Sequence, residues 1–190
     1  IAVLVMSVVV HEVSHGFVAY LLGDSTARLS GRLTLNPIKH IDPVGSIIVP
    51  IVTSFAGFTF GWAKPVPYNP YNIQAGKWGP ALVAAAGPGS NLLLALIFGL
   101  LLRFQVVTGP ATFLLALIVF VNITLAVFNL VPLPPLDGSK VLLSQLPYHL
   151  ARQYQKLEPY GFIILLLFLV SGLLQSVLGV FVGILTTILG

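Results

Sequence analysis

The pentapeptide His11-Glu12-Val13-Ser14-His15 has the residue types and the spacing of a zinc hydrolase. In a helix, residues four apart lie on the same face, so the imidazoles of His11 and His15 can bind one metal ion. The glutamate beside them, Glu12, is then placed to act as a general base. The spacing predicts hydrolysis by zinc-activated water.

Two histidines do not complete such a site, because a catalytic zinc ion usually has three protein ligands and one water. The chain has no cysteine, and its acidic residues are Glu12, Asp24, Asp42, Asp137 and Glu158. Asp137 is the best third ligand, since the prolines before it break a helix and free backbone groups, which membrane proteins tolerate only beside protein or water. Taken alone, Asp137 fits a turn residue in an Asp-Gly bend better than a metal ligand, and it is the need for a third ligand that favours the metal role.

The composition leaves too little charge to cover a water-soluble globule. The chain is 57% hydrophobic and 7% charged, with a mean hydropathy of +1.01, whereas ordinary domains carry about a quarter charged residues. We therefore expect an integral membrane protein. Its nine basic residues are scattered between apolar stretches, which fits the positive-inside rule better than a nucleic-acid-binding face. No nucleic-acid partner is expected.

The apolar stretches predict an all-α polytopic membrane protein with about four to six transmembrane helices. Three helices are clear, at about 1–22, 80–104 and 111–131. Residues 159–190 are apolar throughout, and Ser171-Gly172 leaves one long tilted helix or two short ones open. We expect one integral-membrane domain over 1–190, with its core in about 1–141.

The segment between the first two clear helices and the beginning of the chain each lead to a further prediction. The segment between the first two clear helices alternates at Leu33-Thr34-Leu35 and Phe58-Thr59-Phe60, which predicts a small membrane-associated β element. His11 falls early in its own helix, and the first residue is Ile1. We therefore expect native residues before Ile1.

The stretch 44–63 is apolar but interrupted by Pro50, Gly57 and Gly61. If it does not cross the membrane, eight basic residues lie on one side and only Arg103 on the other. The positive-inside rule therefore favours a re-entrant element over a span. This orientation predicts a multi-pass protein of the cell membrane with its active site nearer the cytoplasmic side.

Taken together, the motifs resemble those of the site-2 proteases, which are intramembrane zinc metalloproteases. The resemblance rests on the pentapeptide in an apolar helix joined to Asn129-Leu130-Val131-Pro132, with Asp137-Gly138 after it. Three further stretches, at 36–45, 61–67 and 86–92, are similar to the short bacterial and archaeal branch without PDZ or CBS domains. The resemblance covers about 8–141.

The resemblance implies that His11, His15 and Asp137 bind one Zn²⁺ per chain and that Glu12 activates water. It also implies that Asn129 faces the substrate strand or the developing oxyanion. The implied activity is hydrolysis of peptide bonds within or near transmembrane segments, as in regulated intramembrane proteolysis. The implied partners are the lipid bilayer and single-span or signal-peptide-like membrane proteins, with the oligomeric state left open.

Other functions and roles compete with these. The chain as a whole also fits a membrane metal transporter or a catalytically silent relative that binds helices. Asn91 and Asn122 fit interhelical hydrogen bonding better than catalysis, and His40 beside Asp42 fits a structural turn better than a second metal site. We expect His149 to be an exposed loop residue. The remaining aromatic residues fit an interfacial belt, formed by Trp62, Tyr68, Tyr71 and Trp78.

Overall fold

The computed structural model describes residues 1–55, 57 and 61–172, and beyond them 176, 179–180, 182–184 and 187. These residues form helices joined by turns and extended loops, with no strand among them. The α-helices are α1 (Ala2–Leu21), α2 (Thr26–Leu29), α3 (Val49–Phe55), α4 (Gly79–Arg103), α5 (Ala111–Leu130), α6 (Asp137–Gln145), α7 (Tyr148–Gln155) and α8 (Gly161–Val170). The all-α prediction is confirmed for this part of the chain.

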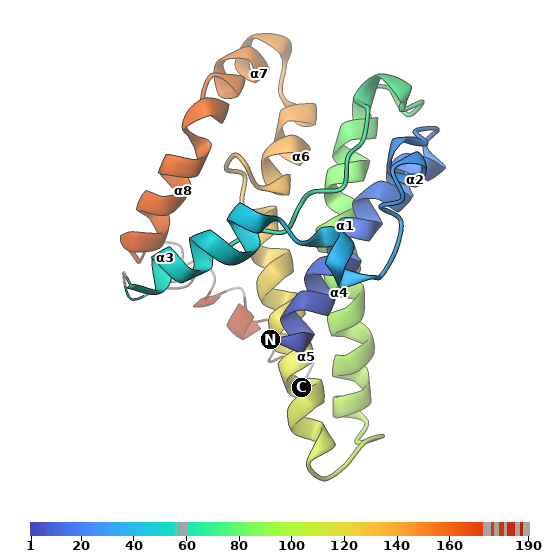
Figure 1. Cartoon of the computed structure of the whole chain (residues 1–190), viewed down its shortest axis with the longest axis vertical. Coiled ribbons are helices and arrows are strands. Elements are labelled where there is room, and N and C mark those ends of the chain that lie inside the picture. Colours follow the sequence, from blue (N-terminus) through green and yellow to red (C-terminus); the bar gives the residue numbers. More distant parts are fainter. Residues whose placement is uncertain are drawn as a thin grey trace.

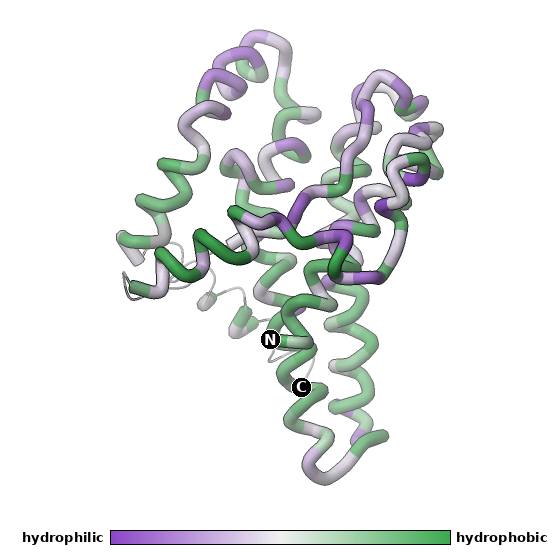
Figure 2. Tube along the Cα trace, viewed as in Figure 1, coloured by the Kyte–Doolittle hydropathy of each residue, from purple (hydrophilic) through white to green (hydrophobic). Residues whose placement is uncertain are grey.

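Three of the helices are long and apolar enough to cross a membrane: Ala2–Leu21, Gly76–Arg103 and Ala111–Leu130. They agree with the stretches predicted at 1–22, 80–104 and 111–131. Figure 1 shows α4 and α5 running side by side, with α1 lying across them. Figure 2 shows that the lower part of α4 and α5 is almost uniformly hydrophobic, whereas the polar residues gather at the opposite end, around α2, α7 and the loop before α4.

Helix α4 lies at the centre of the bundle and packs against α1, α5 and α6. Its buried face consists mostly of small residues: Gly79, Ala81, Val83, Ala84, Gly87, Pro88, Asn91, Ala95 and Gly99. Small residues at helix contacts allow backbones to approach closely, and polar side chains between helices then bond across the contact. The sequence of α4 therefore brings its neighbours close enough for Asn91 to reach both α1 and α5.

The predicted β element is not found in the described residues. Leu33–Leu35 is not a strand but leads into a short 3-10 helix, Pro37–His40, which begins where the Asn36 side chain accepts a hydrogen bond from the Ile38 N–H. The other predicted strand, Phe58–Phe60, lies outside the described residues. The extended chain after it makes single backbone bonds, from Trp62 to Gly45 and from Lys64 to His40. Pro65 and Pro67 have no N–H with which to continue a ladder.

The stretch predicted at 44–63 forms a six-residue π-helix, Pro43–Ile48, followed by the seven-residue α3. At about 1.5 Å per residue this element spans about 20 Å, which is less than the roughly 30 Å of a bilayer core. The described helical element is thus shorter than a membrane span, and re-entry stays a prediction. In the C-terminal region, α8 ends at Val170, and Gly172 has a φ of 75°. A left-handed glycine ends a regular helix, so one unbroken helix over 159–190 is not formed.

Candidate metal centre

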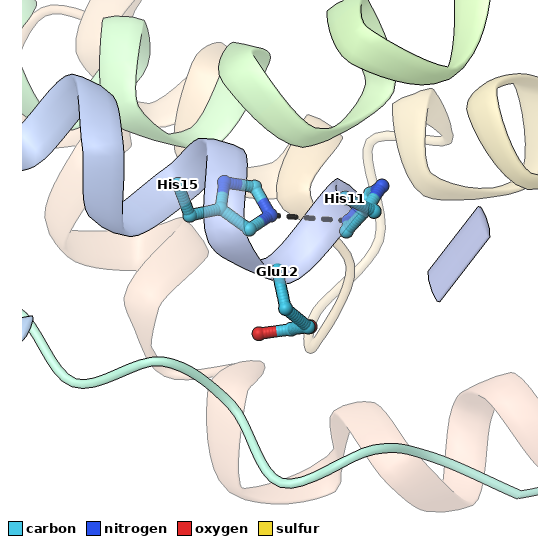
Figure 3. A group of neighbouring side chains, drawn as sticks. All are labelled: His11, Glu12 and His15. Atoms are coloured by element: carbon cyan, nitrogen blue, oxygen red, sulfur yellow. Dashed lines mark hydrogen bonds between the residues drawn. The ribbon is translucent and has the colours of Figure 1, made fainter. Parts of the chain in front are cut away.

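The centre of the site is a triangle of three side-chain atoms from α1 and α6. The Nε2 atoms of His11 and His15 lie 3.1 Å apart, and Asp137 Oδ2 lies 3.1 Å from each of them. All three residues are buried. Figure 3 shows the two imidazoles on α1 turned toward each other. The structure thus brings together the two histidines of the pentapeptide and the aspartate that follows the proline-rich loop.

The protons of both imidazoles are placed by partners on α4. Asn91 donates its amide N–H groups to Asn122 Oδ1 at 2.8 Å and to the Ser7 carbonyl at 3.3 Å, so its Oδ1 is the acceptor that faces His11 Nδ1 at 2.6 Å. His15 Nδ1 donates to the Val83 carbonyl at 2.7 Å. A neutral imidazole protonated on Nδ1 carries a lone pair on Nε2. Both Nε2 atoms therefore present lone pairs to the centre of the triangle.

Three acceptor atoms, two lone pairs and a carboxylate oxygen, converge on one buried point. Such a group is unfavourable unless a cation lies among them, because each atom repels the other two. Tetrahedral zinc with ligands at about 2.0–2.1 Å separates neighbouring ligand atoms by about 3.3–3.4 Å, close to the 3.1 Å separations found here. The donor set therefore fits one zinc ion and leaves the fourth position open.

The loop and helix around Asp137 hold its carboxylate at this point. Asp137 is the first residue of α6, and a Cβ on the next residue, Gly138, would collide with the carbonyl of Leu130 at the end of α5. Only glycine allows the two backbones to lie this close. The carboxylate oxygen Asp137 Oδ2 is thereby held 3.1 Å from the Nε2 atoms of both histidines.

Gly87 on α4 gives the two histidines their space. A Cβ at this position would collide with the Nε2 atoms of both His11 and His15. The stretch Ala86-Gly87-Pro88-Gly89 thus brings helical backbone directly against the ligand triangle. The sequence showed this glycine only as part of a family motif, and its contact with the histidines became visible only in the structure.

Glu12 lies beside the triangle but has a different partner. One of its carboxylate oxygens and a ring nitrogen of each histidine lie within 4.8 Å of one another, so Glu12 competes with Asp137 as a third ligand. The 3.1 Å distances favour Asp137. Glu12 Oε2 instead accepts a hydrogen bond of 2.9 Å from the Val66 N–H. Figure 3 shows the Glu12 side chain leaving α1 toward the extended segment that passes below the site. Glu12 is left available as a base.

Apart from Asn91 and Asn122, the other residues singled out in the sequence have partners outside the triangle or are exposed. Asn129 donates its side-chain N–H to the Leu125 carbonyl of its own helix at 2.9 Å, and none of its hydrogen bonds in the described part of the chain reaches the three residues. His40 is buried and bonded to the Thr34 carbonyl at 2.9 Å, as a structural turn residue would be. His149 is exposed. Trp62 packs its ring against Phe162 of α8, so it also has a structural contact.

Comparison with known proteins places the chain among metallopeptidases. A model of peptidase family M50 matches residues 105–171. The "Putative zinc metalloprotease YwhC" of Bacillus subtilis is 40% identical over 185 residues, which cover 92% of this chain and 81% of that protein. The "Putative zinc metalloprotease Rip2" of Mycolicibacterium smegmatis is 32% identical over 169 residues, which cover 87% of this chain and 64% of that protein. No solved structure matches the chain.

The apolar helices, the buried acceptor triangle and these relatives define a zinc metalloprotease of membranes. The chain belongs to peptidase family M50, the site-2 protease family, as its motifs implied.

Proposed function

We propose that this chain is an intramembrane endopeptidase that hydrolyses peptide bonds within or near transmembrane segments of other membrane proteins. The observation that carries the proposal is the acceptor triangle of His11, His15 and Asp137 next to a separately held carboxylate, Glu12, on a helix that is apolar enough to span a bilayer. Ionisable residues in such helices are costly and usually functional.

In this proposal, His11 Nε2, His15 Nε2 and Asp137 Oδ2 hold one zinc ion. Bound zinc supplies Lewis acidity, which makes water a competent nucleophile near neutral pH and polarises a peptide carbonyl. Glu12 takes a proton from the attacking water and returns it to the leaving amine. Its Oε2 is held by the Val66 N–H, and we assign proton transfer to its other oxygen.

Asn129 is proposed to donate to the substrate strand or to the developing oxyanion. Its amide nitrogen carries two hydrogens, and one hydrogen bond of this nitrogen goes to the Leu125 carbonyl. The second hydrogen is thus the one for substrate, and stabilising the oxyanion in this way typically contributes about 10²–10³-fold in rate.

The proposed substrates are single-span or signal-peptide-like membrane proteins, reached from the bilayer. In support, a mostly apolar cavity of about 440 Å³ lies between the first half of α1, α4 and α5. Its polar lining residues, Ser7 and Asn122, connect through Asn91 to His11. The distribution of basic residues supports a multi-pass protein of the cell membrane with the site nearer the cytoplasmic side.

Substitution of Glu12 by glutamine tests the proposal. The purified wild-type protein in detergent should cleave a single-span reporter in a zinc-dependent manner. The Glu12→Gln variant should retain one zinc ion per chain and lose cleavage by about 10⁴-fold or more, because the amide cannot accept the proton. Cleavage by Glu12→Gln at the wild-type rate would contradict the proposal, and so would metal transport into vesicles without any cleavage.

A further inference from the structure

Glu12 is held by a short extended segment, residues 64–69, which we call the strap. Three of its backbone N–H groups have partners elsewhere in the chain: Lys64 donates to the His40 carbonyl at 2.9 Å, Val66 to Glu12 Oε2 at 2.9 Å, and Asn69 to Asp24 Oδ2 at 2.7 Å. Pro65 and Pro67 separate these donors and keep φ near the extended range. The strap therefore depends on groups from outside it for its position.

Arg32 is the basic residue that holds the strap beside Glu12. It is only 8% exposed, and its Nη2 donates to the Lys64 carbonyl at 2.7 Å and, at 3.4 Å, to the Pro65 carbonyl. In the described part of the chain, Arg32 has no ion pair, and its Nε has no hydrogen-bond partner. Burial of a guanidinium without a carboxylate is costly. Arg28, one turn earlier, is exposed and bonds to the Tyr20 hydroxyl.

One peptide unit links Arg32 to Glu12. The Pro65 carbonyl and the Val66 N–H belong to the same planar peptide bond, and in a trans peptide they point in opposite directions. Arg32 donates to the carbonyl end of this unit, and the N–H end donates to Glu12 Oε2. A donor at the carbonyl polarises the peptide and strengthens the hydrogen bond made by its N–H. The shorter bond to the Lys64 carbonyl fixes the peptide before it.

We propose that Arg32 is a positioning residue for Glu12, acting through the strap and the Val66 N–H. In the described part of the chain, Arg32 makes no hydrogen bond or ion pair with His11, His15 or Asp137, so it would orient the base without holding the metal ligands. With Oε2 fixed by Val66, the second oxygen of Glu12 keeps one direction toward the reacting water, and misplacement by about 1 Å can cost about 100-fold in rate. This inference rests on the proposed role of Glu12.

The test compares Arg32→Gln, Arg32→Lys and the exposed control Arg28→Gln with wild type, using the single-span reporter. For Arg32→Gln we expect kcat per bound zinc to fall about 10- to 100-fold, with KM within about twofold and one zinc ion per chain. Arg32→Lys should recover part of kcat, because an ammonium can donate to one of the two carbonyls. Arg28→Gln should match wild type.

A double-mutant cycle separates orientation of Glu12 from general stability. Val66→Pro removes the N–H and keeps an extended backbone, whereas the control Val66→Ala keeps the N–H. If Arg32 acts through this N–H, Arg32→Gln should slow the Val66→Pro variant by no more than about twofold further. Losses that multiply in the double variant would overturn the inference, and so would a fall in kcat that matches a loss of bound zinc. Equal kcat values for Arg32→Gln and Arg28→Gln would overturn the role of Arg32 but not the proposed function. Absence of zinc-dependent cleavage by the wild-type protein would overturn the proposed function as well.

Discussion

The ligand triangle and the base differ in what holds them. His11, His15 and Asp137 come from helices, and the two imidazoles are fixed by side-chain and backbone groups of α4. Glu12 lies on the same turn of α1 but takes its hydrogen bond from the strap, a loop segment. Zinc affinity should therefore depend on the packing of α1 against α4, whereas turnover should also depend on the position of the strap. Changes in α4 and changes in the strap should separate these two properties.

Among changes to the groups that support the two parts of the site, the largest effect on zinc affinity is expected at the contact between α4 and the triangle. In Gly87→Ala, the new Cβ would meet both Nε2 atoms, and neither α1 nor α4 can shift without disturbing the bundle. We expect zinc affinity to fall by more than about 100-fold, and cleavage with it. Competition with a chromophoric zinc chelator measures the affinity.

Gly89→Ala is the matched control, because a Cβ at Gly89 meets nothing within 4 Å. It should bind zinc as wild type does and gain slightly in stability, by about 0.4–1 kcal/mol. Equal zinc affinity in the Gly87→Ala and Gly89→Ala variants would mean that the close approach of α4 does not matter for the metal.

A smaller effect is expected when the orientation of His11 is lost. Asn91→Leu removes the acceptor of the His11 Nδ1–H and should weaken zinc binding by about 10- to 100-fold. Asn122 accepts a hydrogen bond from Asn91 and not from His11. Asn122→Ala should therefore weaken zinc binding less than Asn91→Leu does. Isothermal titration with zinc ranks the two variants. The reverse order would show that Asn91 serves helix packing alone.

The smallest effect on turnover is expected at the far end of the strap. Asp24 is fully buried. Burial raises its pKa, but hydrogen bonds from Thr26, Asn69 and Asn72 outweigh this, and the pKa is lowered from 3.8. Because the pKa of Asp24 is lower in the folded than in the unfolded chain, its ionised carboxyl group stabilises the fold at pH values above the unfolded-state pKa. This stability is lost as the pH falls through the folded-state pKa. The Tm of the wild-type protein should therefore decrease once the pH drops below about 3.8.

Asp24→Asn lacks this acid-dependent stability. Its Tm at neutral pH should be lower than that of wild type, because the amide loses the charge-assisted hydrogen bonds of the carboxylate. Such a hydrogen bond stabilises the fold by about 1.5–3 kcal/mol. Thermal melts in detergent between pH 7 and pH 3 measure both curves. Zinc content should stay unchanged, since Asp24 does not contact the triangle. An identical pH dependence of Tm in the two proteins would contradict the assignment.

Local patterns in the sequence predicted the three long helices and some of the residues that the structure brings together in the candidate site. The spans at 1–22, 80–104 and 111–131 are long apolar runs with clear ends, and they agree with α1, α4 and α5 to within one or two residues. His11 and His15 follow from helical spacing alone. Asp137 could be chosen because the chain has only five acidic residues, which left few candidates for a third ligand.

Contacts between distant segments could not be predicted in this way. Asn91 lies 80 residues from His11, and nothing local marks it as a partner of an imidazole. Val66 interacts with Glu12 through its backbone N–H, which every residue except proline has. The strand predicted at Leu33–Leu35 rested on three alternating residues, and the prolines of the strap remove the ladder that it would need. Tertiary packing decides these features.

X-ray absorption at the zinc edge, on the purified protein, tests the central claim most directly. We expect one zinc ion per chain with two imidazole nitrogens and oxygen ligands at about 2.0–2.1 Å in four-coordinate geometry. In Asp137→Ala, the ion should be lost or one oxygen ligand replaced by water, with cleavage down by about 10⁴-fold or more. A zinc ion without imidazole scattering, or full zinc content and full cleavage in Asp137→Ala, would contradict the account.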